Sequence, residues 1–172
     1  MTFLPRKKFP AYRIAPSNYD NVFRHEKIQG TVHDPGAAMM GGVAGHAGLF
    51  SDANDLGTLF QMLLQNGNYG GVQYFDSLTV DKFTTQYSKS CRRGLGFDKP
   101  NCGDAASSPT IADASCNTYG HQGFTGTVVW TDPQYHLVYV FLSNRTYPDD
   151  ANQKINTMKI RSEVQQVIYD AM

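Results

Sequence analysis

The sequence has little charge and no long hydrophobic run. Only 17% of its 172 residues are charged, and 15 Lys and Arg residues balance 15 Asp and Glu residues, so the formal net charge is zero. A chain without a basic excess lacks the electrostatic footprint that nucleic acids and anionic membranes attract. No apolar stretch reaches the roughly 20 residues that cross a bilayer. We therefore expect no nucleic-acid partner and no membrane span.

Cysteine is also scarce. Cys91, Cys102 and Cys116 are irregularly spaced, without a CxxC pair or a histidine cluster at ligand spacing. This pattern argues against zinc, and we expect neither a metal nor another cofactor. The three cysteines allow one disulfide with one free thiol, or three free thiols, and the sequence does not choose between these states.

The chain does contain enough apolar material for one folded domain, since 41% of its residues are hydrophobic. Its patterns predict an α+β fold with an antiparallel sheet of about three strands. A C-terminal helix is expected to pack on this sheet, together with one or two further helices. We expect a single domain over residues 1–172.

Residues 1–86 divide into two expected segments. Residues 1–50 are expected to be irregular and loop-rich, because prolines recur and Gly41–Gly48 reads GGVAGHAG. Residues 51–86 are expected to be helical, with Ser51 as the N-cap of the first helix. The apolar positions of that helix share one face: Leu56, Leu59, Phe60 and Leu63.

Residues 87–172 also divide into two expected segments. Residues 87–118 form a polar loop in which GLGF (94–97) is a short candidate strand. Residues 119–172 carry a hairpin, with strands at 127–131 and 137–143, and a helix of about 18 residues from near Ala151. The hairpin strands are almost continuously apolar, so both of their faces are expected to be covered.

Among the histidines, His121 has the most suggestive surroundings. It lies in the stretch GHQG, directly before the first predicted hairpin strand, where a ligand can approach the backbone closely. His33, which Asp34 follows, and His46 have two open interpretations: they line a cleft, or they tether loops by hydrogen bonds. Short basic clusters, such as the one at Arg92–Gly94, are typical of solvated loops.

A search for a complete nucleophilic site fails. The sequence has no GxSxG, and no serine has a lysine three residues later. Tyr19–Asn21 satisfies the loose pattern YxN, but three-letter patterns arise often by chance in a chain of this length. Paired carboxylates typical of glycosidases and phosphate-binding glycine loops are also missing.

Three stretches together resemble the serine β-lactamase-like, penicillin-recognising hydrolases, and most closely their class C-like esterase and D,D-peptidase branch. They are GHAGLFSDANDLGTLFQMLLQNG (Gly45–Gly67), YGHQGFTGT (Tyr119–Thr127) and WTDPQYHLVYVFLSNRTYP (Trp130–Pro148). VHDPGAAMMGGVAGHAG (Val32–Gly48) resembles the version found beside, or fused to, family-three glycoside hydrolases in Bacteroides-type bacteria. The resemblance implies an incomplete β-lactamase-like fold, an α/β sandwich fragment.

The resemblance also implies a set of site residues. His121-Gln122-Gly123 falls where the family carries a K-T-G or H-x-G motif on an inner strand. Lysine offers a constant positive charge to a substrate carboxylate, whereas histidine, with an ordinary pKa of about 6.5, is charged only part of the time. The implied catalytic residues are His121, Gly123 and Phe124, the last as a backbone oxyanion donor. The implied substrate-binding residues are Gln122, Thr125, His33, Asp34 and His46.

In the resembling family, the SxxK and YxN motifs precede the position equivalent to residue 1. The resemblance thus implies the C-terminal part of a hydrolase that transfers the acyl group of an amide or ester, with a peptide or small-molecule substrate and a periplasmic or cell-envelope location. We expect the chain alone to be inactive and to self-associate through an exposed sheet edge. The alternative is a non-catalytic domain that binds peptidoglycan or a protein.

Overall fold

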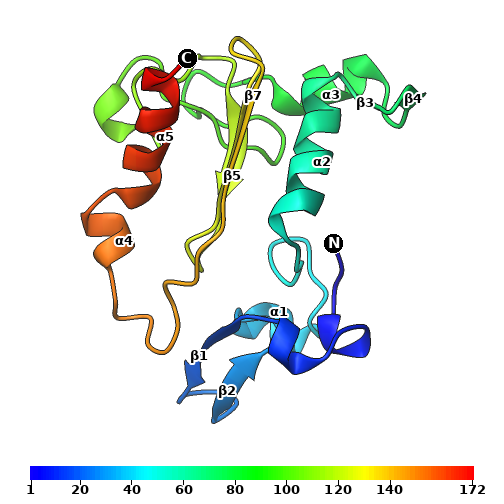
Figure 1. Ribbon diagram of the computed structural model, residues 1–172, viewed down its shortest axis with the longest axis vertical. Coiled ribbons are helices and arrows are strands. Elements are labelled where there is room, and N and C mark those ends of the chain that lie inside the picture. Colours follow the sequence, from blue (N-terminus) through cyan, green and yellow to red (C-terminus); the bar gives the residue numbers. More distant parts are fainter.

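The computed structural model describes residues 1–172 and has an antiparallel sheet between helices (Figure 1). The sheet has the order β5-β6-β7, with β5 at Tyr119–Gln122, β6 at Val128–Asp132 and β7 at Leu137–Phe141. Helix α2 (Ala53–Leu64) lies on one side of the sheet and helix α5 (Ile160–Asp170) lies on the other. The predicted α+β class and three-stranded sheet are confirmed.

Strand β6 is the centre of the core, and all five of its residues are buried. Side chains alternate between the faces of a strand. Val129 therefore packs with Phe60 of α2, whereas Trp130 belongs to a second cluster that Ile168 of α5 contacts. Tyr139 of β7 adds a hydrogen bond of 2.9 Å from its hydroxyl to the Arg161 carbonyl. The expectation that both faces are covered is confirmed.

The helical segment agrees with the prediction except at its first cap. The side chain of Asp52, not that of Ser51, accepts the Asp55 N–H at 2.9 Å and begins helix α2. A carboxylate at this place also interacts favourably with the positive end of the helix dipole. Between α2 and helix α3 (Ser77–Thr84), the chain makes a small hairpin that the prediction missed. Its strands are β3 (Asn68–Tyr69) and β4 (Val72–Gln73).

The predicted C-terminal helix of about 18 residues is wrong in its length. Two helices, α4 (Lys154–Thr157) and α5, stand in its place. Lys159 separates them with a φ of 51°, a left-handed backbone conformation that a continuous right-handed helix excludes. The hydrophobic period continues across this break, so periodicity alone did not reveal it.

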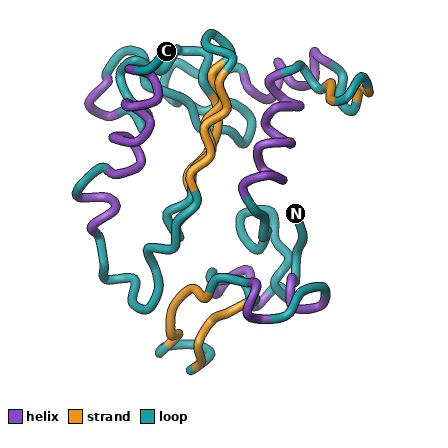
Figure 2. Tube along the Cα trace, in the orientation of Figure 1, coloured by secondary structure: helices purple, strands orange, loops and turns teal.

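The first fifty residues are more regular than expected, which corrects that part of the prediction (Figure 2). The strands β1 and β2 pair antiparallel, and the Arg24 guanidinium closes their connection by binding the Asp20 carboxylate at 2.8 Å. Short strands and single helical turns carry little periodicity, so the glycines and prolines dominated the prediction. The elements are the 3-10 helices η1 (Pro5–Lys7) and η2 (Ala11–Arg13), the strands β1 (Pro16–Asp20) and β2 (Glu26–Gln29), and the helix α1 (Pro35–Met39).

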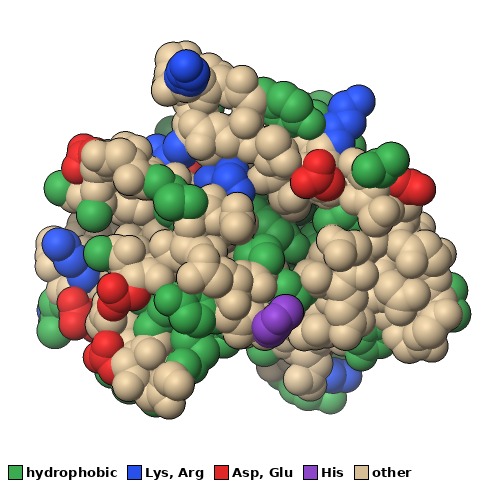
Figure 3. Space-filling view, turned by 90° about the horizontal axis from the view of Figure 1, so that it is seen from above, with side chains coloured by type: hydrophobic (Ala, Val, Ile, Leu, Met, Phe, Trp, Pro, Cys, Tyr) green, Lys and Arg blue, Asp and Glu red, His purple; other side chains and the backbone are tan.

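Several large hydrophobic side chains stay on the surface. In the view from above, hydrophobic side chains gather near the middle of the face (Figure 3). Leu78 of α3 is 76% exposed and Val72 of β4 is 53% exposed. No helix is long and apolar enough to cross a membrane, and no three His, Cys, Asp or Glu side chains cluster at a distance suited to a metal ion.

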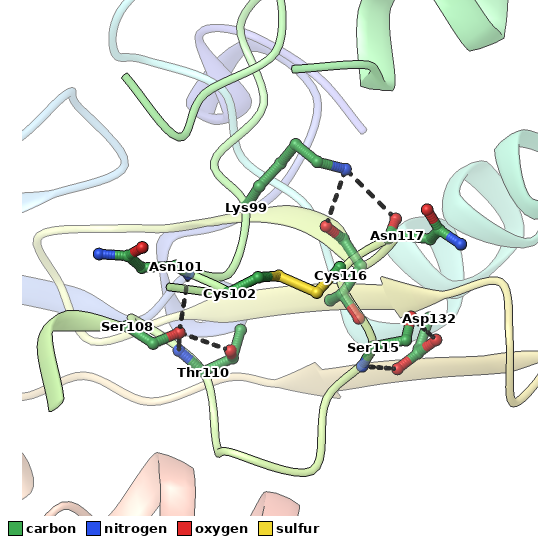
Figure 4. Close-up of a disulfide and its surroundings, with 10 residues drawn as sticks. Lys99, Asn101, Cys102, Ser108, Thr110, Ser115, Cys116, Asn117 and Asp132 are labelled. Carbon is green, nitrogen blue, oxygen red and sulfur yellow. Dashed lines mark hydrogen bonds between the residues drawn. A yellow bond between two sulfur atoms is a disulfide. The ribbon is translucent and has the colours of Figure 1, made fainter. Parts of the chain in front are cut away.

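The polar segment 87–118 is tied down by a disulfide between Cys102 and Cys116 (Figure 4). Cys91 is the free thiol. Of the two states that the sequence allowed, the structure therefore has one disulfide with one free thiol. The buried Lys99 ammonium donates to the carbonyls of Asn117 and Thr118 at 3.4 and 3.2 Å, and burial lowers its pKa. The segment contains one short 3-10 helix, η3 (Ala105–Ser107).

GLGF (94–97) is not a strand, which corrects the prediction for that stretch. The segment pairs with the sheet at Asp98, the residue that follows GLGF. Asp98 and Gly120 exchange two backbone hydrogen bonds, of 2.7 and 3.0 Å, and so add a single bridge to the free side of β5. This bridge brings the polar segment next to the residues of interest.

Candidate active site

Strand β5 carries the candidate motif. His121 lies within this strand and pairs with Val129 of β6, so it is not in a turn ahead of the strand as expected. The pairing places His121 on the α2 side of the sheet, because Val129 faces Phe60 of α2. Gln122 faces the opposite side, where its amide donates to the Pro109 carbonyl at 2.8 Å. The side chains of His121 and Gln122 therefore lie on opposite faces of the sheet.

The hydrogen bonds of His121 fix its tautomer. The Arg93 guanidinium (Nη1) lies 3.2 Å from Nε2 of the imidazole, and Nδ1 lies 2.8 Å from the Gln122 carbonyl oxygen. Arginine has no acceptor, so Nε2 must accept and Nδ1–H must donate. This assignment describes a neutral imidazole, and the positive charge of the pair is on Arg93.

Arg93 is held over the strand by a compact ion cluster. Asp98 is 5% exposed, and Arg92 binds it through two parallel hydrogen bonds of 2.7 and 2.9 Å. Arg93 makes only a longer contact of 3.7 Å to the same carboxylate. Arg92–Gly94 is thus not simply a solvated loop, which corrects that interpretation.

Gly123 begins a tight turn at the end of β5. Its N–H donates to the Thr127 carbonyl at 2.8 Å, and its own carbonyl accepts the Gly126 N–H at 3.0 Å. A Cβ atom at position 123 would lie 2.4 Å from Thr127 Oγ1, so a side chain there would displace this turn. The next residue, Phe124, has a backbone N–H that donates to no group of the protein. The turn therefore presents one free donor directly after the motif.

The remainder of this turn is fixed by Arg145. Its guanidinium stacks on the Phe124 ring at 4.3 Å, and its Nε donates to the Phe124 carbonyl at 2.7 Å. The Arg145 N–H donates to the Thr125 carbonyl at 3.0 Å. Thr125 is held through its backbone, and its side chain makes no hydrogen bond to the protein. These contacts fix the Phe124 ring and the carbonyls of Phe124 and Thr125.

His33 also lies against the Phe124 ring, and the two ring centroids are 5.2 Å apart. Its imidazole contacts the Ser17 hydroxyl, which lies 3.1 Å from the Thr146 hydroxyl. Arg24 anchors the backbone by donating to the His33 carbonyl at 2.7 Å. Burial lowers the pKa of His33, which favours a neutral ring. The structure therefore brings this predicted residue to the turn that follows the motif.

Asp34 and His46 pair with each other. His46 Nε2 lies 3.0 Å from the Asp34 carboxylate, which also caps helix α1 by accepting the Ala37 N–H at 2.7 Å. The Ala37 N–H, and then His46, hold the pKa of Asp34 below its ordinary value. Neither side chain hydrogen-bonds to residues 119–127, so the contacts of this pair are those of a loop tether.

Two residues of this arrangement were missed by sequence reasoning. Arg93 was assigned to a solvated cluster, and Arg145 was not singled out. A usable signal existed for Arg93, because an arginine pair precedes Asp98 at a spacing that lets one arginine neutralise the carboxylate. The contacts of Arg145 span 20 residues to Thr125 and carry no local pattern.

Comparison with known proteins identifies the family of this chain. The family model described as beta-lactamase matches residues 2–160. The chain belongs to the beta-lactamase family. The matched residues include β5 and the turn after it, so the HxG motif lies in this beta-lactamase domain.

This beta-lactamase family chain is similar to curated proteins that are provisionally named D-alanyl-D-alanine carboxypeptidase. Those from Salmonella typhi, Salmonella newport and Salmonella agona are each 45% identical to it over 141 residues. The match covers 81% of this chain and 32% of each relative. The match thus extends over about a third of the length of these relatives.

Proposed function

We propose that this chain forms one wall of the acyl-transfer site of a serine hydrolase. The reaction is attack on the carbonyl of an amide or ester, of the D,D-peptidase or esterase type. The free Phe124 N–H carries this proposal. It follows the HxG motif, and the carbonyl of the same peptide, that of Gly123, accepts the Gly126 N–H at 3.0 Å.

The chemistry assigned to this wall is stabilisation of an oxyanion. When a hydroxyl attacks a carbonyl, the oxygen becomes negative, and a backbone N–H in a fixed direction stabilises that charge. Gly123 permits the tight turn that exposes this N–H, because a Cβ atom would meet Thr127. His121 contributes a neutral imidazole on the same strand.

The nucleophile of the proposed reaction comes from outside these 172 residues. No serine of this sequence has the SxxK spacing of the family. Removing the nucleophile from a catalytic unit abolishes most of its rate enhancement. The isolated chain is therefore expected to have no activity above background on a nitrophenyl ester.

The substrate and location are part of the same proposal. The names of the Salmonella relatives support a peptide that ends in D-alanyl-D-alanine. The Cys102–Cys116 disulfide supports an oxidising compartment such as the periplasm, because reducing compartments keep thiols free. The likeness of Val32–Gly48 to proteins associated with family-three glycoside hydrolases supports a Bacteroides-type context.

A chimera tests the proposed function. This chain would replace the matched segment of the Salmonella typhi relative, and release of D-alanine from a D-alanyl-D-alanine peptide would be measured. We expect Gly123→Ala to lower turnover by about a hundredfold, the typical effect of losing an oxyanion donor. The matched control is Gly45→Ala, because a Cβ atom at position 45 meets nothing within 4 Å.

Three outcomes would contradict the proposal. A folded chimera that releases no D-alanine, while the relative itself does, would favour a non-catalytic binding domain. Equal effects of Gly123→Ala and Gly45→Ala would remove the role assigned to the turn. Ester turnover by the isolated chain that a serine reagent abolishes would show that the nucleophile lies within it.

A further inference from the structure

We infer that a small polar cavity beside the N-terminal end of α5 binds a phosphate group. The cavity has a volume of about 130 Å³, which is room for roughly four water molecules. Gln122 and Trp130 line it, and both of these side chains face the α5 side of the sheet. His121 lies on the other face and does not line the cavity. The cavity is therefore separate from the proposed acyl-transfer wall.

The lining of the cavity carries two positive charges and no negative charge. Lys159 and Arg161 line it, and no aspartate or glutamate does. Neither cation forms an ion pair with a carboxylate elsewhere in the chain. Burial lowers the pKa of Arg161, and the nearby charge of Arg145 lowers it further. An anion in the cavity would compensate these charges, because an opposite charge nearby favours the charged form of a group.

The cavity also has hydrogen-bond donors that the protein does not use. Gln165 lines it and is 1% exposed, yet its Nε2 amide group has no acceptor in the protein. A guanidinium carries five N–H groups, and the only hydrogen bond from the Arg161 side chain joins Nη2 to Asn156 Oδ1 at 2.8 Å. The Ser162 side chain lies in the same lining. These donors suit a ligand with several acceptor oxygens.

The backbone of α5 strengthens the same preference. This helix has 11 residues, and no side chain caps its N-terminus at Lys159. The first N–H groups of a helix have no partner within the helix, and the helix dipole places partial positive charge at this end. An open helix N-terminus beside an arginine and a lysine matches the charge and the oxygens of phosphate. The ligand class is inorganic phosphate or a phosphate monoester.

Phosphate binding to the 172-residue chain tests this site. Trp130 is the only tryptophan and lines the cavity, so its fluorescence reports on occupancy. Sodium phosphate would be titrated at neutral pH, with sodium chloride at equal ionic strength as the reference. We expect a saturable change in emission with phosphate alone, together with shifts of the backbone amide NMR signals of residues 160–165. Arg161→Gln should weaken binding about tenfold, as the loss of one charge-assisted contact implies.

Two further variants separate binding from a structural role. Ser162→Asp places a negative charge in the first turn of α5, where it favours the helix but repels phosphate. This variant should keep its melting temperature and lose phosphate binding. Lys154→Gln is the matched control, because Lys154 is an exposed cation on α4 that does not line the cavity. It should bind phosphate as the unsubstituted chain does. Thermal unfolding in chloride shows whether each variant folds.

Glycerol 3-phosphate distinguishes the two sources of a phosphate group. Saturable binding of both ligands supports a site that accepts a phosphate carried by a larger molecule, whereas binding of inorganic phosphate alone supports a site for the free ion. An emission that phosphate leaves unchanged, or that chloride changes equally, would overturn the inference. Equal affinity of Arg161→Gln and the unsubstituted chain for phosphate would overturn it as well.

Discussion

At the scale of single residues, Asp132 holds three parts of the chain together. This carboxylate is 1% exposed and accepts hydrogen bonds from the Ser115 N–H at 2.8 Å and the Ser115 hydroxyl at 2.6 Å. It also accepts the Gln134 N–H at 3.0 Å and the Tyr169 hydroxyl at 2.8 Å. Burial acts to raise the pKa of Asp132, but these hydrogen bonds outweigh it and hold the pKa below its ordinary value.

The lowered pKa makes Asp132 a source of acid sensitivity. A carboxyl whose pKa is lower in the folded chain stabilises it above the unfolded pKa of about 3.9. That stability is lost as the pH falls through the folded value. We expect Asp132→Asn to reduce the free energy of unfolding by about 2 kcal/mol at neutral pH. The deficit should shrink below about pH 4.

Urea unfolding across this pH range measures the deficit. Glu26→Gln is the matched control, because Glu26 is exposed on β2 and makes no hydrogen bond through its side chain. Its free energy of unfolding should track that of the unsubstituted chain at every pH. A deficit for Asp132→Asn that stays constant down to the lowest pH would show that the charge of Asp132 is not the cause.

The site residues could be predicted only in part at this scale. The sequence GHQG identified His121 and Gly123, because a motif is contiguous and its residue types are visible. The partners of His121 could not be read in this way. Arg93 reaches it across 28 positions, through a bridge that depends on how the polar segment folds.

At the scale of elements, the polar segment 87–118 depends on its disulfide. Cys102 and Cys116 are 14 residues apart, and the chain between them contains only one turn of 3-10 helix. Cross-linking a loop of this length restricts the unfolded chain and stabilises the folded state by about 3 kcal/mol. We expect the double variant Cys102→Ser, Cys116→Ser to lose about this free energy of unfolding.

Denaturant unfolding with and without a reductant checks this expectation. The reductant should destabilise the unsubstituted chain and leave the double variant unchanged. Cys91→Ser is the control, since Cys91 is exposed and unbonded, and it should retain full stability. A double variant as stable as the unsubstituted chain would mean that the loop is held by its other contacts, among them those of Lys99.

Elements with a strong period were predicted well, and short elements were not. Helix α2 and the hairpin of β6 and β7 occur close to their expected bounds, because their apolar side chains face a core at a regular spacing. Strands β3 and β4 have two residues each, too few to display a period, and β1 (PSNYD) and β2 (EKIQ) contain few apolar side chains. The bridge at Asp98 is a tertiary contact with no local signature.

At the scale of the whole molecule, the sheet has an open edge. Strand β7 pairs with β6 alone, and α2 and α5 cover the faces of the sheet without covering this edge. An unpaired edge offers backbone donors and acceptors to another strand. We propose that isolated chains self-associate through this edge, so the average mass in sedimentation experiments should rise with concentration.

A surface variant distinguishes this route from hydrophobic association. Leu78→Lys removes a side chain that is 76% exposed on α3, away from the sheet. Association through the β7 edge should persist in this variant, whereas association through exposed apolar side chains should weaken. A chain that stays strictly monomeric at high concentration would rule out both routes.

The sequence by itself determined the family, the α+β class, the central hairpin and the motif, because these depend on residue types at fixed spacings along the chain. Only the tertiary structure decided the disulfide pairing, the neutral tautomer of His121, the place of His33 beside Phe124 and the charge of Arg93 at the motif. Each of these depends on distances between segments far apart in the sequence. Such distances follow from packing, which no local pattern specifies.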